Sequence, residues 1–163
     1  MNQETKRSIY IDATIVSYLT SKPTRNLLAA AWNEITVNWW ENKRSKFDLY
    51  ISALVVDEVS RGDGLASTRR LQALKEIPYV VINDEVVAIA KVLVQKKGPI
   101  PEKAINDAMH IALAAVHNID YLLTWNFRHL DNAETKPRVR EIALFMVTNA
   151  RRFALHRSLW EEN

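Results

Sequence analysis

The chain has 163 residues, with no cysteine and only three glycines. Without cysteine it can have neither a disulfide framework nor a thiolate metal site. The sequence also contains no glycine-rich phosphate loop, no G-x-S-x-G motif and no zinc-ligand spacing. These absences argue against nucleotide kinases, serine hydrolases and zinc enzymes.

Long apolar runs and a strong excess of one charge are also missing. The first residues, MNQETKRSIYID, form a polar lead, which argues against a signal peptide or membrane span and predicts a cytosolic protein. Lysine and arginine number 22 against 19 aspartates and glutamates, a net charge of +3. This excess permits a polyanionic partner but does not require one.

What is present is a core-forming composition with alternating strand and helix patterns. With 48% hydrophobic residues, the chain is long enough for one globular domain. Strands are predicted at 8–11, 47–51, 79–82 and 120–124, and helices at 13–19, 24–43, 53–62, 65–77, 84–96 and 105–118. This alternation predicts an α/β domain with a mostly parallel sheet.

The segment from Ile105 to Leu130 is the most informative, because it places a charge in an apolar helix. Asp107 has small or apolar neighbours at helical spacing, namely Ala104, Ala108 and Ile111. A carboxylate in such surroundings costs several kcal/mol unless it has a partner. We therefore expect other parts of the chain to supply that partner.

Polar side chains follow the predicted strands at their carboxyl ends. Asp12 comes directly after the first strand, Glu58 is on the helix that follows the second, and Asn126 lies two residues past the last. In open parallel sheets, ligands bind at this edge. We expect these side chains to gather there with Asp107.

Three clustered carboxylates repel each other unless a cation compensates them. Oxygen ligands without cysteine favour Mg²⁺ or Mn²⁺, which bind phosphate oxygens and activate water. Asp12, Glu58 and Asp107 are the predicted metal ligands, which implies hydrolysis of a phosphodiester.

Three neutral side chains complete the predicted site. Asn126 would orient a water or a phosphate rather than add charge, and Thr14 and Thr124 would support the ligands through their hydroxyls.

Each candidate also has an ordinary structural explanation. Asp12 could cap the next helix, Glu58 could be a surface residue, and Asp57 could take the role of Glu58. His110 could be a structural histidine, a partner of Asp107 or a metal ligand.

Other conspicuous residues favour structural roles. His117 and His129 are interpreted as helix-end and loop residues. Trp32, Trp39 and Trp40 indicate core or lid packing, with base stacking as the alternative, and Arg69-Arg70 indicates a solvated face, with phosphate contact as the alternative.

Four motifs in order resemble a known family. They are IYIDATIVSYLT, SALVVDEVSRGD, EKAINDAMHIALAAVHNIDYLLTWN and TWNFRHLDNAE, and together they cover roughly residues 8–141. The chain resembles PIN-domain ribonucleases of the VapC-like toxin type. On this resemblance, Asp12, Glu58 and Asp107 fall on the three family acids.

The resemblance implies a three-layer α/β/α PIN-like domain with a central, mostly parallel sheet. It also implies Mg²⁺- or Mn²⁺-dependent endonucleolytic cleavage of RNA, a cognate antitoxin protein and a homodimer. Many members carry a fourth acid where this chain has Asn126, but a branch of the family resembles the TWN pattern found here.

The C-terminus departs from the resemblance. Similar members continue with a His-Gly turn, a short strand and a T-P-x-E-L ending, whereas this chain reads ALFMVTNARRFALHRSLWEEN. Its codons, read with the first two bases dropped from Ala143, permit such an ending. We therefore predict a nuclease domain at 1–142 and a frame-shifted tail at 143–163, with the last strand missing and the sheet edge open. The coding sequence tests this, because some single-base change must restore that ending.

Two classes of function remain open at this point. One is a metal-dependent endoribonuclease of toxin type, and the other is a catalytically silent PIN-like module that binds RNA or a protein. A small-phosphoester hydrolase is a weaker third, because no activated nucleophile or phosphate-clamping lysine can be placed.

Overall fold

A four-stranded parallel sheet forms the centre of the molecule. The computed structural model describes residues 6–96, 98–126, 128, 130, 133, 136–146 and 154–155. The strands are β1 (Arg7–Ile11), β2 (Phe47–Tyr50), β3 (Tyr121–Leu123) and β4 (Ala154–Leu155), arranged in the order β2-β1-β3-β4. Adjacent strands pair in parallel throughout the sheet.

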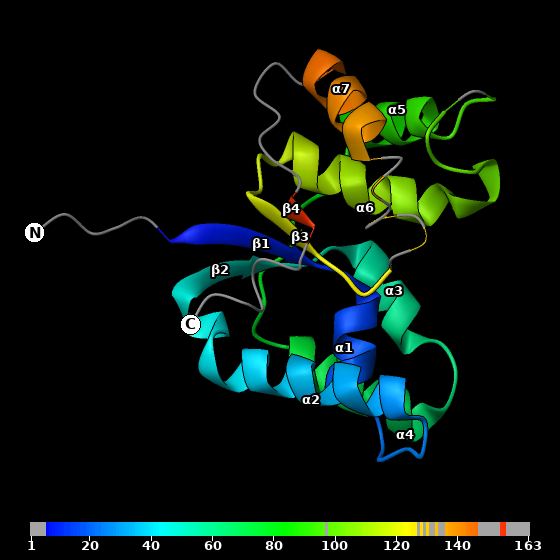
Figure 1. Cartoon of the computed structure of the whole chain (residues 1–163). Coiled ribbons are helices and arrows are strands. Elements are labelled where there is room, and N and C mark those ends of the chain that lie inside the picture. Colours follow the sequence, from blue (N-terminus) through cyan, green and yellow to red (C-terminus); the bar gives the residue numbers. More distant parts are fainter. Residues whose placement is uncertain are drawn as a thin grey trace, which may run out of the picture.

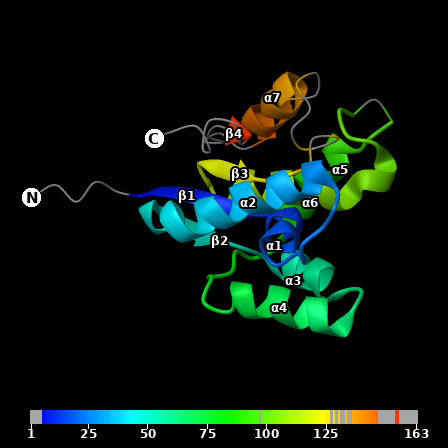
Figure 2. The same cartoon turned by 60° about the horizontal axis from the view of Figure 1, so that its bottom comes forward.

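Helices cover both faces of the sheet, as Figures 1 and 2 show. One group packs together below the sheet in Figure 1, with α3 at its rim: α1 (Ala13–Leu19), α2 (Leu27–Asn42), α3 (Ala53–Ser60) and α4 (Gly64–Leu74). The other group lies above it: α5 (Asp84–Leu93), α6 (Ile105–Val116) and α7 (Lys136–Met146). Two 3₁₀ turns, Arg44–Lys46 and Glu102–Ala104, precede β2 and α6. The predicted three-layer α/β/α fold is confirmed.

The sequence forms this arrangement because the end of β1 and most of α6 consist of buried, mainly apolar residues. Ile9, Tyr10 and Ile11 of β1 are fully buried, as expected for a strand covered on both faces. Helix α6 is alanine-rich, and its small side chains let it pack closely against the sheet and α5. Trp39 is fully buried and Trp40 nearly so, which confirms their predicted packing role.

Several local predictions were wrong in detail. Residues 79–82 do not form a strand. Tyr79 makes a single bridge to Ile51, the residue after β2, and Val81 is exposed. Asn26 caps α2 through its side chain, so this helix begins at Leu27 and not at residue 24 as predicted.

The C-terminal prediction is partly testable. β4 pairs with β3 at Tyr121 and Leu122, so the sheet edge expected to be open is paired over these two residues. Residues 147–153 and 156–163 lie outside the described residues, as does His129, and the domain division at 142 stays a prediction. Within the described chain, no helix is long and apolar enough to cross a membrane.

Candidate active site

Asp12 lies at the carboxyl edge of the sheet, between β1 and α1. Its side chain is only 3% exposed. Oδ1 accepts hydrogen bonds from the Thr14 amide at 3.0 Å and the Thr14 hydroxyl at 2.5 Å, and Oδ2 accepts one from the Thr124 hydroxyl at 2.6 Å. Asp12 therefore caps α1, as one interpretation predicted, and also faces the edge where the site was expected.

These hydrogen bonds do not fully compensate the burial of Asp12. Burial raises the pKa of the Asp12 carboxyl above its ordinary value, although the charge of His110 and the bonds from Thr124 and Thr14 act in the opposite direction. The ionised carboxylate is thus held in an unfavourable environment, and a cation beside it would relieve the cost.

The loop after β3 is attached to Asp12 through the same two threonines. The Trp125 amide donates to the Thr14 hydroxyl at 2.8 Å, and the Asn126 amide donates to the Thr124 hydroxyl at 2.9 Å. Each threonine oxygen therefore donates to Asp12 and accepts from the loop. Thr14 and Thr124 thus contact Asp12 through their hydroxyls, and their role in supporting a metal site stays a prediction.

An aromatic anchor holds this loop in place. The ring of Trp125 stacks on Trp32 with centroids 5.4 Å apart, and its Nε1 donates to Thr36 Oγ1 at 2.8 Å in the interior. Tyr18 packs edge-on against Trp32. The tryptophan of the T-W-N sequence thus fixes the backbone that positions Asn126.

Asp107 lies in the first turn of α6, because the regular helix begins only at Ile105. This differs from the expected place inside a buried helix, and the side chain is half-buried. The positive end of the helix dipole stabilises a carboxylate at this position. Asn126 Nδ2 donates to Asp107 Oδ1 at 3.0 Å, which gives Asp107 an uncharged partner from the loop.

Glu58 contacts two residues of α6, Asn106 and His110, and is not grouped with the other acids of the described chain. His110 Nε2 lies 3.0 Å from Glu58 Oε2, and Asn106 Nδ2 donates to Glu58 Oε1 at 3.2 Å. On its other side, His110 Nδ1 lies 3.0 Å from the hydroxyl of Tyr10, which in turn lies 2.7 Å from Ser52 Oγ. His110 is therefore buried and bonded to Glu58, whereas Asp107 acts on it through its charge.

Electrostatics favour the charged form of this histidine. Burial alone would lower the pKa of His110, but its hydrogen bond to Glu58 and the charges of Glu58, Asp12 and Asp107 outweigh burial and raise the pKa. An imidazolium here partly neutralises the acidic edge.

The structure brings the predicted acids to one edge without closing them around a common point. Within the described residues, no three histidine, aspartate or glutamate side chains are grouped to hold a metal ion. Asp12 and Asp107 are linked through Thr124 and Asn126, whereas Glu58 is bound to His110 and Asn106.

The donor chemistry fits a small hard cation even so. Mg²⁺ commonly binds through one or two carboxylates, several waters and phosphate oxygens of a substrate. Asp12 and Asp107 supply two such carboxylates, and the raised pKa of Asp12 shows that its charge lacks full compensation. Whether Glu58 becomes a third ligand stays a prediction.

Three residues of this network were not predicted. Asn106 lies next to Asp107 in the sequence, which was a usable signal for a polar role. Tyr10 lies in the strand predicted at 8–11, and a buried tyrosine hydroxyl normally needs a partner. Ser52 precedes α3, but its side chain makes no capping bond and lies 2.7 Å from the Tyr10 hydroxyl.

These carboxylates lie at the carboxyl edge of a parallel sheet between two helical layers, which is where ligands bind in such folds. The family model described as PIN domain matches residues 9–134. The chain therefore belongs to the PIN domain family, whose members are generally nucleases that use divalent metals. A search of curated proteins finds no match.

Proposed function

We propose that the protein is a Mg²⁺- or Mn²⁺-dependent endoribonuclease, and the toxin of a VapC-like toxin–antitoxin pair in the cytosol. The observation that carries the nuclease proposal is the hydrogen-bonded link, through Thr124 and Asn126, between the buried carboxylate of Asp12 and that of Asp107 at the sheet edge. The toxin role rests on the resemblance of the four sequence motifs.

The residues have separable roles in this proposal. Asp12 and Asp107 would hold the metal, which when bound would polarise the phosphodiester and lower the pKa of a water. Thr14 and Thr124 fix the orientation of Asp12, and Asn126 fixes that of Asp107.

Glu58, like Asp12, lies close enough to His110 for its charge to raise the pKa of that histidine. It is proposed either to join the metal after leaving His110 or to orient an attacking water. In both cases His110 and Asn106 determine where its carboxylate rests.

The direct test is cleavage of a mixed RNA pool with Mn²⁺. Asp107→Asn keeps the shape of the side chain and is expected to abolish cleavage with the fold intact, because it removes one carboxylate ligand. Asp48→Asn is the matched control, since Asp48 is an exposed acid of β2. Equal cleavage by wild type and Asp107→Asn would reject the proposed site.

The second candidate is a catalytically silent module that binds RNA or a protein. It is favoured by the pairing of Glu58 with His110 and by the amide of Asn126 at the position of the fourth acid. Metal titration separates the two candidates. Absence of Mg²⁺ or Mn²⁺ binding at millimolar concentrations would support the silent module.

The toxin role and the homodimer need their own measurements. Expression of the chain is expected to arrest growth, and coexpression of the neighbouring gene is expected to restore it. Sedimentation of the purified chain should give the mass of a dimer. If the chain cleaves RNA but its expression does not slow growth, the nuclease function is kept and the toxin role is rejected.

A further inference from the structure

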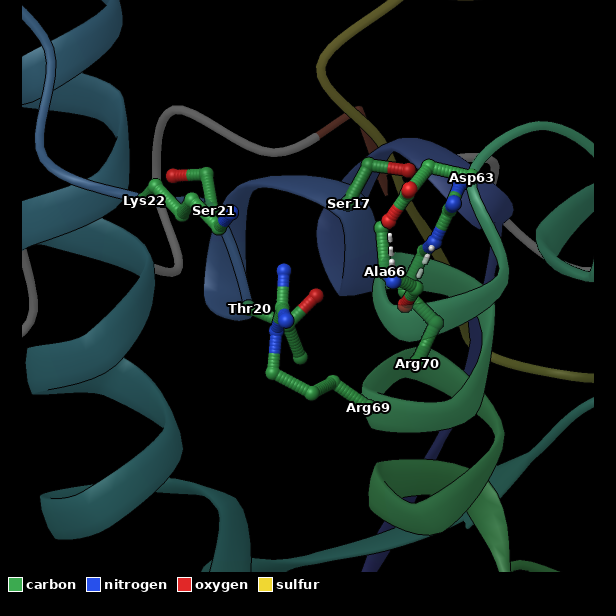
Figure 3. Close-up of a pocket in the computed structure, with 8 residues that line it drawn as sticks. All are labelled: Ser17, Thr20, Ser21, Lys22, Asp63, Ala66, Arg69 and Arg70. Atoms are coloured by element: carbon green, nitrogen blue, oxygen red, sulfur yellow. Dashed lines mark hydrogen bonds between the residues drawn. The ribbon is translucent and has the colours of Figure 1, made fainter.

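A groove between α1 and α4 lies outside the acidic site. Its volume is about 440 Å³. Figure 3 shows its lining, which comes from α1 and the residues after it on one side and from the start of α4 on the other. It is lined by eight residues, all but Ala66 with polar or charged side chains: Ser17, Thr20, Ser21, Lys22, Asp63, Ala66, Arg69 and Arg70.

The groove concentrates positive charge. Lys22, Arg69 and Arg70 face a single carboxylate, Asp63, so the lining carries a net charge of +2. The whole chain carries only +3. A ligand of this groove should therefore be an anion.

Two of the cations are available to a ligand. Arg70 is committed to backbone carbonyls, with Nε 3.2 Å from Ala66 O and Nη2 3.2 Å from Arg61 O. Lys22 and Arg69 are exposed and make no hydrogen bond or ion pair within the described part of the chain. Asp63, the only acid of the lining, is used to cap α4 through the Ala66 amide at 2.9 Å.

The hydroxyls of the groove have spare acceptor capacity. Ser17 donates to Ala13 O at 2.8 Å, Thr20 to Val16 O at 3.0 Å, and Ser21 to Tyr18 O at 3.0 Å. With its proton engaged, each hydroxyl oxygen can still accept from a donor. A ribose 2′-hydroxyl is such a donor, whereas deoxyribose has none.

The groove begins close to the acidic edge. Helix α1 starts directly after Asp12, and at 1.5 Å per residue Ser17 and Thr20 lie about 8 and 12 Å from Asp12 along the axis. Lys22 follows Thr20 immediately, and Figure 3 shows Arg69 extending from α4 toward Thr20. The groove therefore leads away from the carboxylates along α1.

We propose that this groove binds the RNA strand on one side of the cleaved bond, with Lys22 and Arg69 on its phosphates. The oxygens of Ser17, Thr20 and Ser21 accept from the 2′-hydroxyls and favour RNA over DNA. This inference rests on the proposed nuclease function, because it assigns the substrate's path to the same site.

The test is binding of a fluorescent single-stranded RNA to the full chain carrying Asp107→Asn, which prevents cleavage. In this background, Lys22→Ala with Arg69→Ala is compared with Lys46→Ala and Lys91→Ala. Both pairs remove two exposed lysine or arginine charges, but the second pair lies outside the groove.

The groove pair is expected to weaken RNA binding at least tenfold, against less than twofold for the control pair. The plot of log affinity against log salt concentration has a negative slope, and the loss of two phosphate contacts should make it less steep by about 1.4. Ser17→Ala with Ser21→Ala should bring the affinities for RNA and for DNA of the same sequence closer together. Thermal unfolding verifies that all variants are folded.

Equal RNA binding by the groove pair and the control pair would overturn the proposal. Displacement of the RNA by polyglutamate as effectively as by inorganic polyphosphate would also overturn it, in favour of an acidic polypeptide. RNA binding does not depend on catalysis, so a wild type that binds but does not cleave RNA would reject only the proposed nuclease function. A wild type that cleaves RNA, together with equal RNA binding by the two double variants, would reject only the proposed role of the groove.

Discussion

The acidic edge has two sides that compensate negative charge in different ways. On the β1–β3 side, Asp12 is buried and accepts hydrogen bonds only from neutral donors, Thr14 and Thr124, while the charge of His110 acts on it without a hydrogen bond. On the α3–α6 side, Glu58 faces His110, whose raised pKa favours the charged form.

This difference indicates which side has a place for a metal. A carboxylate paired with an imidazolium gains less from a cation than one surrounded by hydroxyls, because its charge is already balanced. We infer that Asp12 and Asp107 form the binding side of the site, and that His110 keeps Glu58 in position until substrate or metal arrives.

Asp12→Asn, like Asp107→Asn, should have the largest effect on activity. Several kcal/mol of metal-dependent stabilisation would be lost, which corresponds to a decrease of about 10³-fold in the rate of RNA cleavage. The stability of the folded protein should not fall with this substitution. The raised pKa means that the charged form is disfavoured in the folded state, so the variant should be at least as stable as wild type at pH 7.

The sign of the stability change can be checked against pH. The cost of the Asp12 charge is absent below its unfolded pKa of 3.8 and appears as pH rises through the raised folded value. Thermal unfolding in EDTA should therefore show an advantage of Asp12→Asn at neutral pH that disappears in acid. A variant that is markedly less stable at neutral pH would contradict the account.

His110→Gln should lower both stability and activity by intermediate amounts. The variant loses a hydrogen bond to a charged group, worth about 2 kcal/mol in urea-induced unfolding. Misplacement of Glu58 should reduce cleavage by about 10- to 100-fold, as for other residues that orient metal ligands. Unchanged cleavage would show that Glu58 is not needed where His110 holds it.

The stability of His110→Gln should also differ from that of wild type in a pH-dependent way. Because the folded pKa of His110 is raised above 6.5, its stabilisation is fully present below that pH and is lost as pH rises through the folded value. The difference in unfolding free energy between wild type and His110→Gln, measured in EDTA, should shrink with rising pH. A difference that stays constant from pH 6 to pH 9 would mean that folding does not raise the pKa of His110.

Asn126→Asp should have the smallest effect. It replaces the hydrogen bond to Asp107 with repulsion, which should lower metal-free stability by about 1 kcal/mol. The added carboxylate should tighten Mn²⁺ binding several-fold, measured by calorimetry. Weaker binding would mean that the amide of Asn126 is required to hold Asp107.

The sequence predicted the sheet edge better than it predicted the contacts along it. Asp12, Thr14, Thr124 and Asn126 follow strands directly, so strand patterns alone place them at one edge. Glu58 and His110 lie on different helices, 52 residues apart, and their pairing depends on how α3 and α6 face each other. No periodicity in the chain fixes that angle.

The wrongly predicted strand at 79–82 has a related cause. Its residues Tyr79, Val80, Val81 and Ile82 have high strand propensity, but β2 ends at Tyr50 and leaves little backbone beside it. The neighbouring strand decides whether such a segment forms a ladder.

Mn²⁺ binding by the purified protein tests the central claim most directly. Wild type should bind Mn²⁺ at submillimolar concentrations in calorimetry, and the folded double variant Asp12→Asn/Asp107→Asn should not bind at all. Asp48→Asn should bind as wild type does. Equal Mn²⁺ binding by the double variant and wild type, or no binding by wild type at millimolar concentrations, would contradict the account.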